Sequence, residues 1–286
     1  MYRDSGPMCS LPGLLVPQLF SPSPVGAPLI GVLHLPPLPG SPRPGPGMTA
    51  ILDWALRDAE ALVLGGARGI IVENLGDAPF DVLVEPHVTA ALAVVARAVV
   101  LRFGDAVAVG VNALRNDPLA SLGAAAASGA TFVRVNVHVG TMVTDQGIIE
   151  GKPRNTLLYR HRVAPDVRVV ADLLVKHAAP LAPVDLGQLA RDTAHRGGAD
   201  VLVLTGSGTG QPTDLDRVRL VRAAVPEALV WVGSGVTAET AADVGAVAHG
   251  AIVGSSLHEG GDLRAPLSRD RVRAVVDALA AGAARR

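Results

Sequence analysis

From Leu29 onward, short runs of β-branched residues alternate with alanine-rich segments that have a helical period. This alternation is typical of βα units that surround a parallel sheet. The predicted strands span residues 29–34, 69–74, 106–112, 131–137, 167–172, 200–205, 229–233 and 250–253. The predicted helices span residues 48–64, 86–102, 118–128, 156–162, 186–196, 213–224, 238–243 and 269–281. Eight strands, each followed by a helix, favour a closed (β/α)8 TIM barrel of the α/β class over an open sheet.

The barrel is predicted to form one domain over residues 28–286, with a proline-rich extension over residues 1–27. Six prolines fall within residues 1–28, and no amphipathic period joins them. We expect this leader to be disordered or draped over the barrel. Removal of residues 1–24 is therefore expected to leave the thermal midpoint nearly unchanged.

Composition narrows the classes of function. Hydrophobic residues make up 49% of the 286 residues and charged residues only 18%, which is enough apolar material for a large core. The net charge is −1 and no basic patch stands out, so nucleic acid is not an expected partner. The lone Cys9 excludes a disulfide framework and favours a cytoplasmic location. No apolar run reaches the roughly 20 residues of a membrane span, so membrane insertion is not expected; homo-oligomerisation stays open.

Strand alternation predicts which polar side chains enter the barrel. Arg134, Asn136 and His138 share one parity, while the neighbouring valines share the other and suit the helix-facing layer. The inward residues approach the carboxyl ends of the strands, where barrel enzymes carry their chemistry. The alternative is an internal polar network that only fixes the core, and it applies most strongly to Arg134.

Polar residues also close three other predicted strands on the inward parity: His34, Asn112 and Asp172. Each of them could instead cap the following loop. Their agreement across several strands favours a binding site. We therefore predict that His34, Asn112, Arg134 and Asn136 bind substrate.

The segment 172–177 carries the densest group of titratable side chains. Asp172, Lys176 and His177 are candidates for acid–base catalysis, together with His138 and Glu73. A Schiff base on Lys176 would require desolvation. The alternative is a salt bridge between Asp172 and Lys176 at the rim, with His177 in solvent. Glu73, Asp172 and histidines offer metal ligands, but no HxH or HExxH spacing supports a site, so a divalent metal is second to no metal and no cofactor is predicted.

Glycine and serine follow the last two predicted strands. The turns at Ser234, Gly235, Gly254 and Ser255 occupy the position where barrels often hold a phosphate, which makes a small phosphorylated substrate the expected partner. The alternative is a pair of tight turns that need glycine's freedom.

Two further loops offer contacts to a substrate. Gly206 and Ser207 begin a glycine-rich loop after the sixth strand, which is either a ligand contact or a flexible connector. The long connection 138–155 is predicted to act as a lid, with Asp145 and Gln146 as contacts. An Asx-type turn ending at Gly147 is the alternative for this pair.

Several long motifs occur in one order along the chain: GVLHLPPLPGSP at 31–42, ENLGDAPF at 73–80, VNALRND at 111–117, RVNV at 134–137, TDQG at 144–147, DLLVKHA at 172–178 and VGSS at 253–256. Over residues 28–277 the chain resembles the BtpA/SgcQ family. The resemblance implies a (β/α)8 barrel. The family is named for photosystem I biogenesis in phototrophs, and other members resemble proteins of sugar or nucleoside metabolism. The chain departs at His258, where the resemblance leads us to expect a lysine.

Two hypotheses of different classes follow. The first is an enzyme that acts on a phosphorylated sugar or nucleoside-like phosphosugar by acid–base chemistry, with isomerisation, retro-aldol cleavage and glycosidic-bond chemistry all open. The second is a non-catalytic assembly or stabilising factor of the BtpA type, for which the polar residues at the rim would be dispensable.

Overall fold

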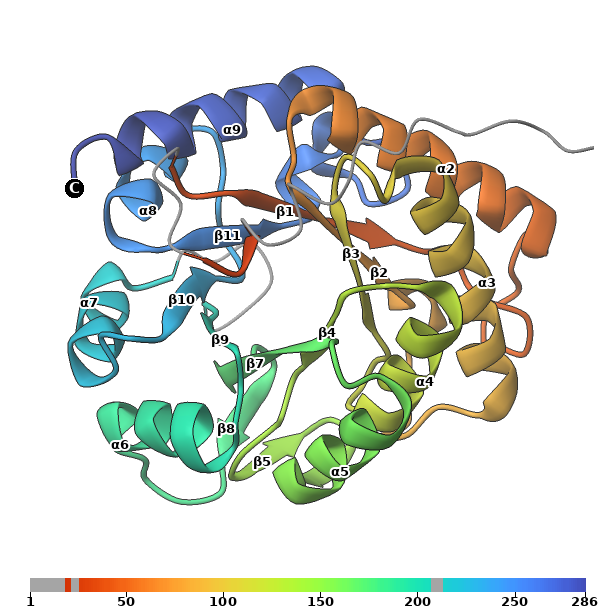
Figure 1. Cartoon of the computed structure of the whole chain (residues 1–286). Helices are drawn as coiled ribbons and strands as arrows, with labels where there is room; N and C mark the ends of the chain where they lie inside the picture. The colour runs from red at the N-terminus through yellow and green to blue at the C-terminus, as the bar shows by residue number, and fades with distance from the viewer. Residues whose placement is uncertain (1–18, 22–25, 207–212) are drawn as a thin grey trace, which may run out of the picture.

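Eight parallel strands close into a barrel in the computed structural model, which describes residues 19–21, 26–206 and 213–286 (Figure 1). Around the barrel the strands follow the order β1-β2-β3-β4-β7-β9-β10-β11. Their bounds are β1 Leu29–His34, β2 Gly69–Glu73, β3 Ala108–Asn112, β4 Phe132–Val135, β7 Arg168–Leu174, β9 Val201–Leu204, β10 Leu229–Val232 and β11 Gly250–Val253. The predicted (β/α)8 TIM barrel is confirmed.

Helices surround the strands on the outside of the barrel (Figure 1). They are α2 Met48–Gly65, α3 Pro86–Phe103, α4 Pro118–Ser128, α5 Pro153–Val163, α6 Leu186–Arg191, α7 Leu215–Ala224, α8 Ala241–Val247 and α9 Arg269–Ala283. Several predicted helix bounds shift by about one turn, among them the starts of α5 and α8 and the end of α8, which lies at Val247. α5 begins at Pro153, because proline is well suited to the first turn of a helix. α8 begins only after Thr240, whose hydroxyl bonds the amide of Thr237.

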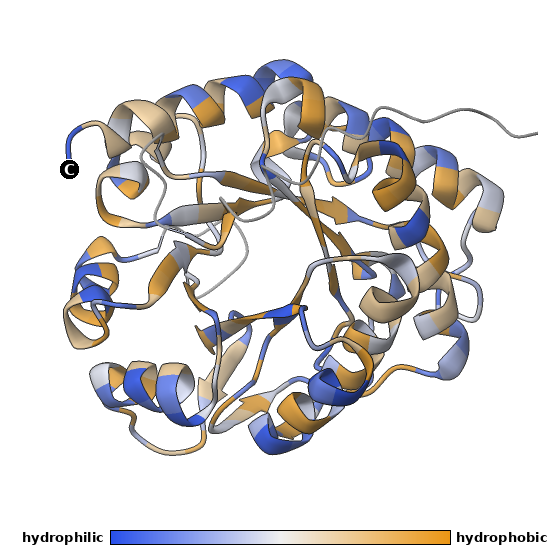
Figure 2. Cartoon of the chain, in the orientation of Figure 1, coloured by the Kyte–Doolittle hydropathy of each residue, from blue (hydrophilic) through white to orange (hydrophobic). Residues whose placement is uncertain are grey.

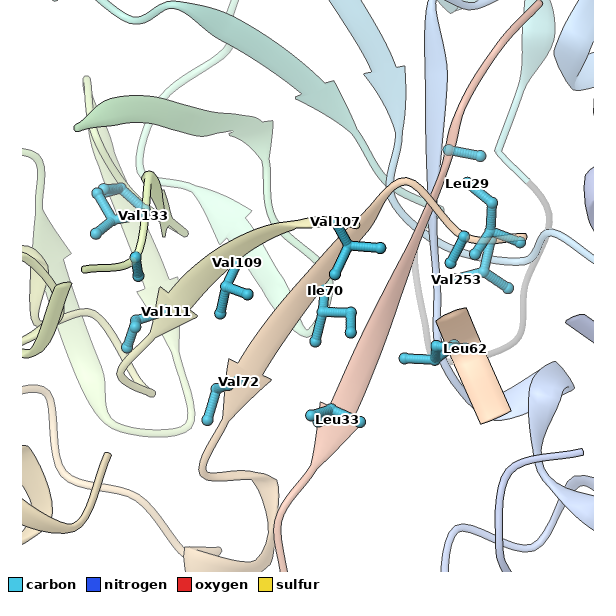
Figure 3. Packing of buried hydrophobic residues seen from close by; sticks show 14 of the residues in the cluster. Leu29, Leu33, Leu62, Ile70, Val72, Val107, Val109, Val111, Val133 and Val253 are labelled. Atoms are coloured by element: carbon cyan, nitrogen blue, oxygen red, sulfur yellow. The ribbon is translucent and has the colours of Figure 1, made fainter. Parts of the chain in front are cut away.

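Outward-facing side chains form the main core, between the strands and the helices. Figure 2 shows apolar residues along the strands and polar residues on the outer faces of the helices. In Figure 3 the outward valines of β2 and β3 lie in a row beside Leu33 of β1 and Leu62 of α2. The two-residue alternation of the strands therefore sends one set of side chains to this layer and the other set into the barrel.

The inward side chains form a second, smaller core at the amino-terminal end of the barrel. Its members include Phe132, Trp231 and Leu19. Leu19 is 3% exposed, and the ring of Phe20 lies 5.7 Å from that of Phe132 and 5.9 Å from that of Trp231. The expectation of a draped or disordered leader is therefore wrong for these two residues. Leu19 and Phe20 pack against the apolar side chains that fill the amino-terminal end of the barrel.

A small antiparallel sheet lies beyond the carboxyl ends of the barrel strands. It has the order β6-β5-β8, from β5 Thr141–Thr144, β6 Gly147–Glu150 and β8 Ala178–Pro180. The connection predicted as a lid loop is thus a β-hairpin, and Asp145 and Gln146 form its turn. Met142 and Ile149 pack with Val175, which fixes the hairpin over the end of β7.

Helix α3 is long and apolar enough to cross a membrane, judged by length and composition alone. The core helix of a globular protein passes the same test. One face of α3 packs into the layer between strands and helices, through Leu92, Val95 and Val99 among others.

Candidate functional site

Polar side chains gather inside the barrel where the strands end. Each takes the inward position after an apolar one: Glu73 follows Ile71 on β2, and Arg134 follows Phe132 on β4. Because parallel strands end on one face, these side chains meet there. On these two strands the inward position is therefore apolar within the barrel and polar at the carboxyl end.

Asp172 and Arg134 form a buried ion pair across β4 and β7. Arg134 Nε donates to Asp172 Oδ1 and Nη2 to Oδ2, both at 3.0 Å, and Asn136 Nδ2 donates to Oδ2 at 3.1 Å. Both partners lie almost wholly out of solvent. Burial opposes the charge on Arg134, but Asp172 and Glu73 outweigh it, so the pKa of Arg134 is raised. The alternative prediction of a salt bridge between Asp172 and Lys176 is therefore wrong, because the Arg134 guanidinium engages both carboxylate oxygens of Asp172.

Glu73 anchors a second group of polar side chains. Its Oε2 accepts a 2.7 Å hydrogen bond from Asn112 Nδ2, and its Oε1 lies 3.8 Å from His34 Nε2. The His34 ring stacks on His258, with centroids 5.8 Å apart. Burial lowers the pKa of His34 to about 4, although the charge of Glu73 opposes the shift. His34 is consequently neutral at pH 7.

Lys176 is the middle residue of the three that connect β7 to β8. Arg115 Nη2 donates to the Lys176 carbonyl at 2.7 Å, and the exposed His177 follows with φ +57°. Burial lowers the pKa of Lys176, with Glu73 acting against the shift and Arg134 in favour of it. The turn thus directs an amine of reduced basicity into the barrel mouth.

Two glycine–serine turns also line the mouth of the barrel. The first, 233–237, has Gly235 at φ +68°, and Ser234 Oγ accepts from the amide of Gly206 at 2.6 Å. The second, 254–256, passes close to His34: a Cβ on Gly254 would lie 2.5 Å from His34 Cε1. Glycine is needed there because the imidazole fills the space of a side chain.

These groups line one cavity of about 130 Å³ at the carboxyl end of the barrel. Its polar side comprises His34, Glu73, Arg134 and Lys176, and the two turns supply the predicted phosphate-binding residues Ser234, Gly235, Gly254 and Ser255. Residues predicted from six separate segments of the chain therefore meet at one place.

Other predicted residues lie outside this cavity. His138 is fully buried beneath the rim, where Nε2 bonds the Gly197 carbonyl at 2.8 Å, and burial lowers its pKa. This contact ties the end of β4 to the π-helical segment Asp192–Arg196 after α6. Gln146 lines a separate hollow near Gly40 and Asn74. Ser207 lies outside the described residues.

Arg115 is the residue that the sequence predictions missed. It is buried, and its guanidinium feels the charges of Asp172, Asp145 and Glu73. It stands within the VNALRND motif, directly after the inward strand end at Asn112. A basic residue in that loop was the available signal. Among the residues that the structure describes, no group of three or more His, Cys, Asp or Glu side chains is arranged to hold a metal.

The fold and cavity define a TIM-barrel protein with a polar site at the carboxyl end of its strands. The family model of the BtpA family matches residues 26–281, and the chain belongs to that family. It is 42% identical over 258 residues to the photosystem I biogenesis protein BtpA of Synechocystis sp., covering 89% of this chain and 88% of that one. An uncharacterised protein of Pyrococcus furiosus is 40% identical over 249 residues, covering 87% and 93%.

Solved structures share the fold at low sequence identity. Phosphoribosyl anthranilate isomerase from Thermus thermophilus matches with a TM-score of 0.53 and 18% identity, covering 88% of this chain and 98% of that one. Tryptophan synthase of Mycobacterium tuberculosis matches with a TM-score of 0.56 and 20% identity, covering 90% and 92%. At this identity the likeness shows the TIM barrel alone.

Proposed function

We propose that this protein is an enzyme that acts on a phosphorylated sugar or nucleoside-like phosphosugar by acid–base chemistry. The observation that carries the proposal is the composition of the cavity. One cavity is lined both by two glycine–serine turns and by the titratable side chains of Glu73, Lys176 and His34. An anion-binding end and a proton-transfer end within one cavity suit a small substrate with a phosphate at one terminus.

The phosphate is assigned to the turns after β10 and β11. In TIM barrels the loops after the seventh and eighth strands frequently hold a phosphate, and β10 and β11 occupy those places in chain order. Ser255 and Ser256 open a short 3-10 turn, whose first amides lack acceptors within the turn. Arg134 also lines the cavity and supplies fixed positive charge.

Proton transfer is assigned to Glu73 and Lys176. Both line the cavity, and the pKa of Lys176 is lowered by burial, which brings an amine closer to proton exchange near neutral pH. Asp172 is instead a positioning residue, because Arg134 and Asn136 engage its carboxylate. Asn112 orients the Glu73 carboxylate through its 2.7 Å hydrogen bond, and the neutral His34 lies 3.8 Å from the other carboxylate oxygen.

Calorimetry with ribose 5-phosphate, inorganic phosphate and ribose tests the assignment. Ser255→Asp places a carboxylate beside the expected phosphate, and like charges should weaken ribose 5-phosphate binding about tenfold or more. Ser41→Asp is the matched control, because Ser41 lies on the neighbouring hollow outside the cavity. A crystal soaked with ribose 5-phosphate should show the phosphate beside Gly235 and Ser255. An occupied phosphate elsewhere on this face would contradict the proposal.

The second candidate function is a non-catalytic assembly factor, favoured by the name of the Synechocystis relative. It predicts that the cavity binds none of the three ligands and that Glu73→Gln and Lys176→Met leave its function intact. The calorimetric series therefore separates the two candidates.

A further inference from the structure

We propose that Lys176 forms an imine with the open-chain aldehyde or ketone group of the phosphorylated sugar held in the cavity. This inference rests on the proposed function and narrows it to carbonyl chemistry, such as isomerisation or retro-aldol cleavage. Glycosidic-bond chemistry does not use such an intermediate.

The chain uses arginine almost everywhere that it needs a cation. Of its 25 basic residues, only Lys152 and Lys176 are lysines. Lys152 is exposed, whereas Lys176 lines the cavity. Charge alone at this place could come from arginine, as it does at Arg134 nearby. A primary amine differs in that it can lose its proton and attack a carbonyl carbon, which a guanidinium does not do in proteins.

The setting of Lys176 leaves its amine available to a ligand. Within the described residues, no hydrogen bond or ion pair holds the side-chain nitrogen, while Arg115 fixes the backbone carbonyl. The charged groups that act on the amine are Glu73, Asp172, Arg134 and Arg115. Burial and the two guanidinium groups favour the neutral amine, and although the carboxylates of Glu73 and Asp172 act against them, the pKa of Lys176 is lowered.

The proposed step balances without any other reactant. The neutral Lys176 nitrogen adds to the carbonyl carbon, and the π-electron pair moves to the oxygen as the C–N bond forms. Glu73 relays the two amine protons to the oxygen one after the other, so that the oxygen leaves as one water and a neutral imine forms. The imine nitrogen then regains from solvent the proton that the Lys176 ammonium gave up before it attacked. The protonated imine then withdraws electrons from the adjacent C–H or C–C bond, and hydrolysis regenerates the amine.

Borohydride trapping tests this step on the full-length protein. Sodium borohydride reduces an imine to a stable secondary amine, so the protein should gain the mass of the sugar phosphate less one oxygen atom. Ribose 5-phosphate and dihydroxyacetone phosphate are the probes, and ribose is the unphosphorylated control. Peptide mapping of the wild-type protein locates the adduct directly, so the result does not depend on whether a variant folds.

The expected adduct lies on Lys176 alone, persists in Lys152→Arg, disappears in Lys176→Arg and is suppressed by inorganic phosphate. Glu73→Gln should slow trapping at least about tenfold while the adduct stays at Lys176. Absence of an adduct with both phosphorylated probes overturns the imine, as does labelling of Lys152 or the terminal amine that phosphate does not suppress. Parallel calorimetry distinguishes the two failures. Binding without an adduct removes only the imine, and absence of binding removes the proposed function as well.

Discussion

The two ends of this barrel are built from the same strands and differ in the inward-facing side chains, which are apolar at the amino-terminal end and polar at the carboxyl end. At the amino-terminal end the inward positions hold Phe132, Trp231 and their apolar neighbours, with Leu19 and Phe20 inserted between them. Two residues further along β4 the inward position holds Arg134. The same two-residue alternation therefore builds both the apolar core and the polar site. The residue type at each inward position decides which end of the barrel can do chemistry.

The difference also appears in how each end is stabilised. The apolar end gains from burial and ring contacts, which have little directionality. The polar end depends on a few oriented contacts, because buried charges are costly unless paired and hydrogen-bonded. Substitutions should therefore cost most where a charge loses its partner and least where a side chain only has to shift.

The largest effect is expected from breaking the Arg134–Asp172 pair. Asp172→Asn leaves the buried guanidinium without its charge partner, which should lower the free energy of unfolding by about 3–5 kcal/mol. Chemical denaturation at pH 7 measures the change. The double variant Arg134→Met/Asp172→Leu removes both charges and should be less destabilised than Asp172→Asn. A near wild-type stability for Asp172→Asn would show that the pair contributes nothing.

The next largest effect is expected from removing Leu19 or Phe20, which pack in the amino-terminal end of the barrel. Leu19→Ala should lower the free energy of unfolding by about 2–5 kcal/mol, because a buried leucine leaves a cavity behind. Removal of residues 1–24 should cost at least as much, since Phe20 is lost as well. Leu220→Ala, on the exposed face of α7, is the control and should change stability by less than about 1 kcal/mol. An unchanged melting temperature after the truncation would contradict this prediction and support the expectation that the leader is only draped over the barrel.

Alternation within strands was enough to predict the barrel and the inward-facing side chains. The strand bounds of β1 and β11 agree with the prediction, and Glu73 and Asn112 end their strands as predicted, whereas β7 continues two residues beyond Asp172 to Leu174. What alternation cannot give is the pairing of those residues, since it depends on three-dimensional reach. Asp172 pairs with Arg134 because the guanidinium on the neighbouring strand donates one hydrogen bond to each carboxylate oxygen.

Other features escaped prediction because their causes are not local. The hairpin of β5 and β6 gains a third strand, β8, from a distant part of the chain, and β7 carries a register shift between Asp172 and Leu174. Leu19 follows a run of prolines and has no periodic neighbours, so nothing in its surroundings signals burial. Arg115 acts through a backbone carbonyl of Lys176, a contact that no spacing rule reveals.

A pH effect from His34 would sharpen the contrast between the ends. Its pKa is lowered to about 4 in the folded protein, against an ordinary value near 6.5, so below pH 6.5 the unfolded chain binds a proton that the folded chain does not. Stability is thus fully present above pH 6.5 and falls as the pH drops toward 4, by roughly 2 kcal/mol between pH 7 and pH 5. His34→Gln should lose this part of the slope. The half-buried His249, whose pKa is also lowered to about 4, contributes equally to both proteins and cancels in the comparison.

The last substitution concerns Gly254, whose lack of a side chain leaves room for the His34 imidazole. A Cβ at Gly254 would lie 2.5 Å from His34 Cε1 and 3.0 Å from Nε2, and the imidazole is also stacked on His258. Gly254→Ala should therefore displace the ring and lower the free energy of unfolding by about 1–3 kcal/mol.

Gly123→Ala is the matched control for this substitution. Gly123 lies in α4, and an added Cβ would meet only Tyr159 Oη at 3.5 Å, so this change should raise stability by about 0.5–1 kcal/mol. Denaturation of both variants at pH 7 and pH 5 tests the reason as well as the size of the effect. If the displaced imidazole reaches solvent, its pKa returns toward 6.5 and Gly254→Ala loses the His34 part of the pH slope, whereas Gly123→Ala keeps it. A Gly254→Ala protein with the full wild-type slope would show that the ring has not moved.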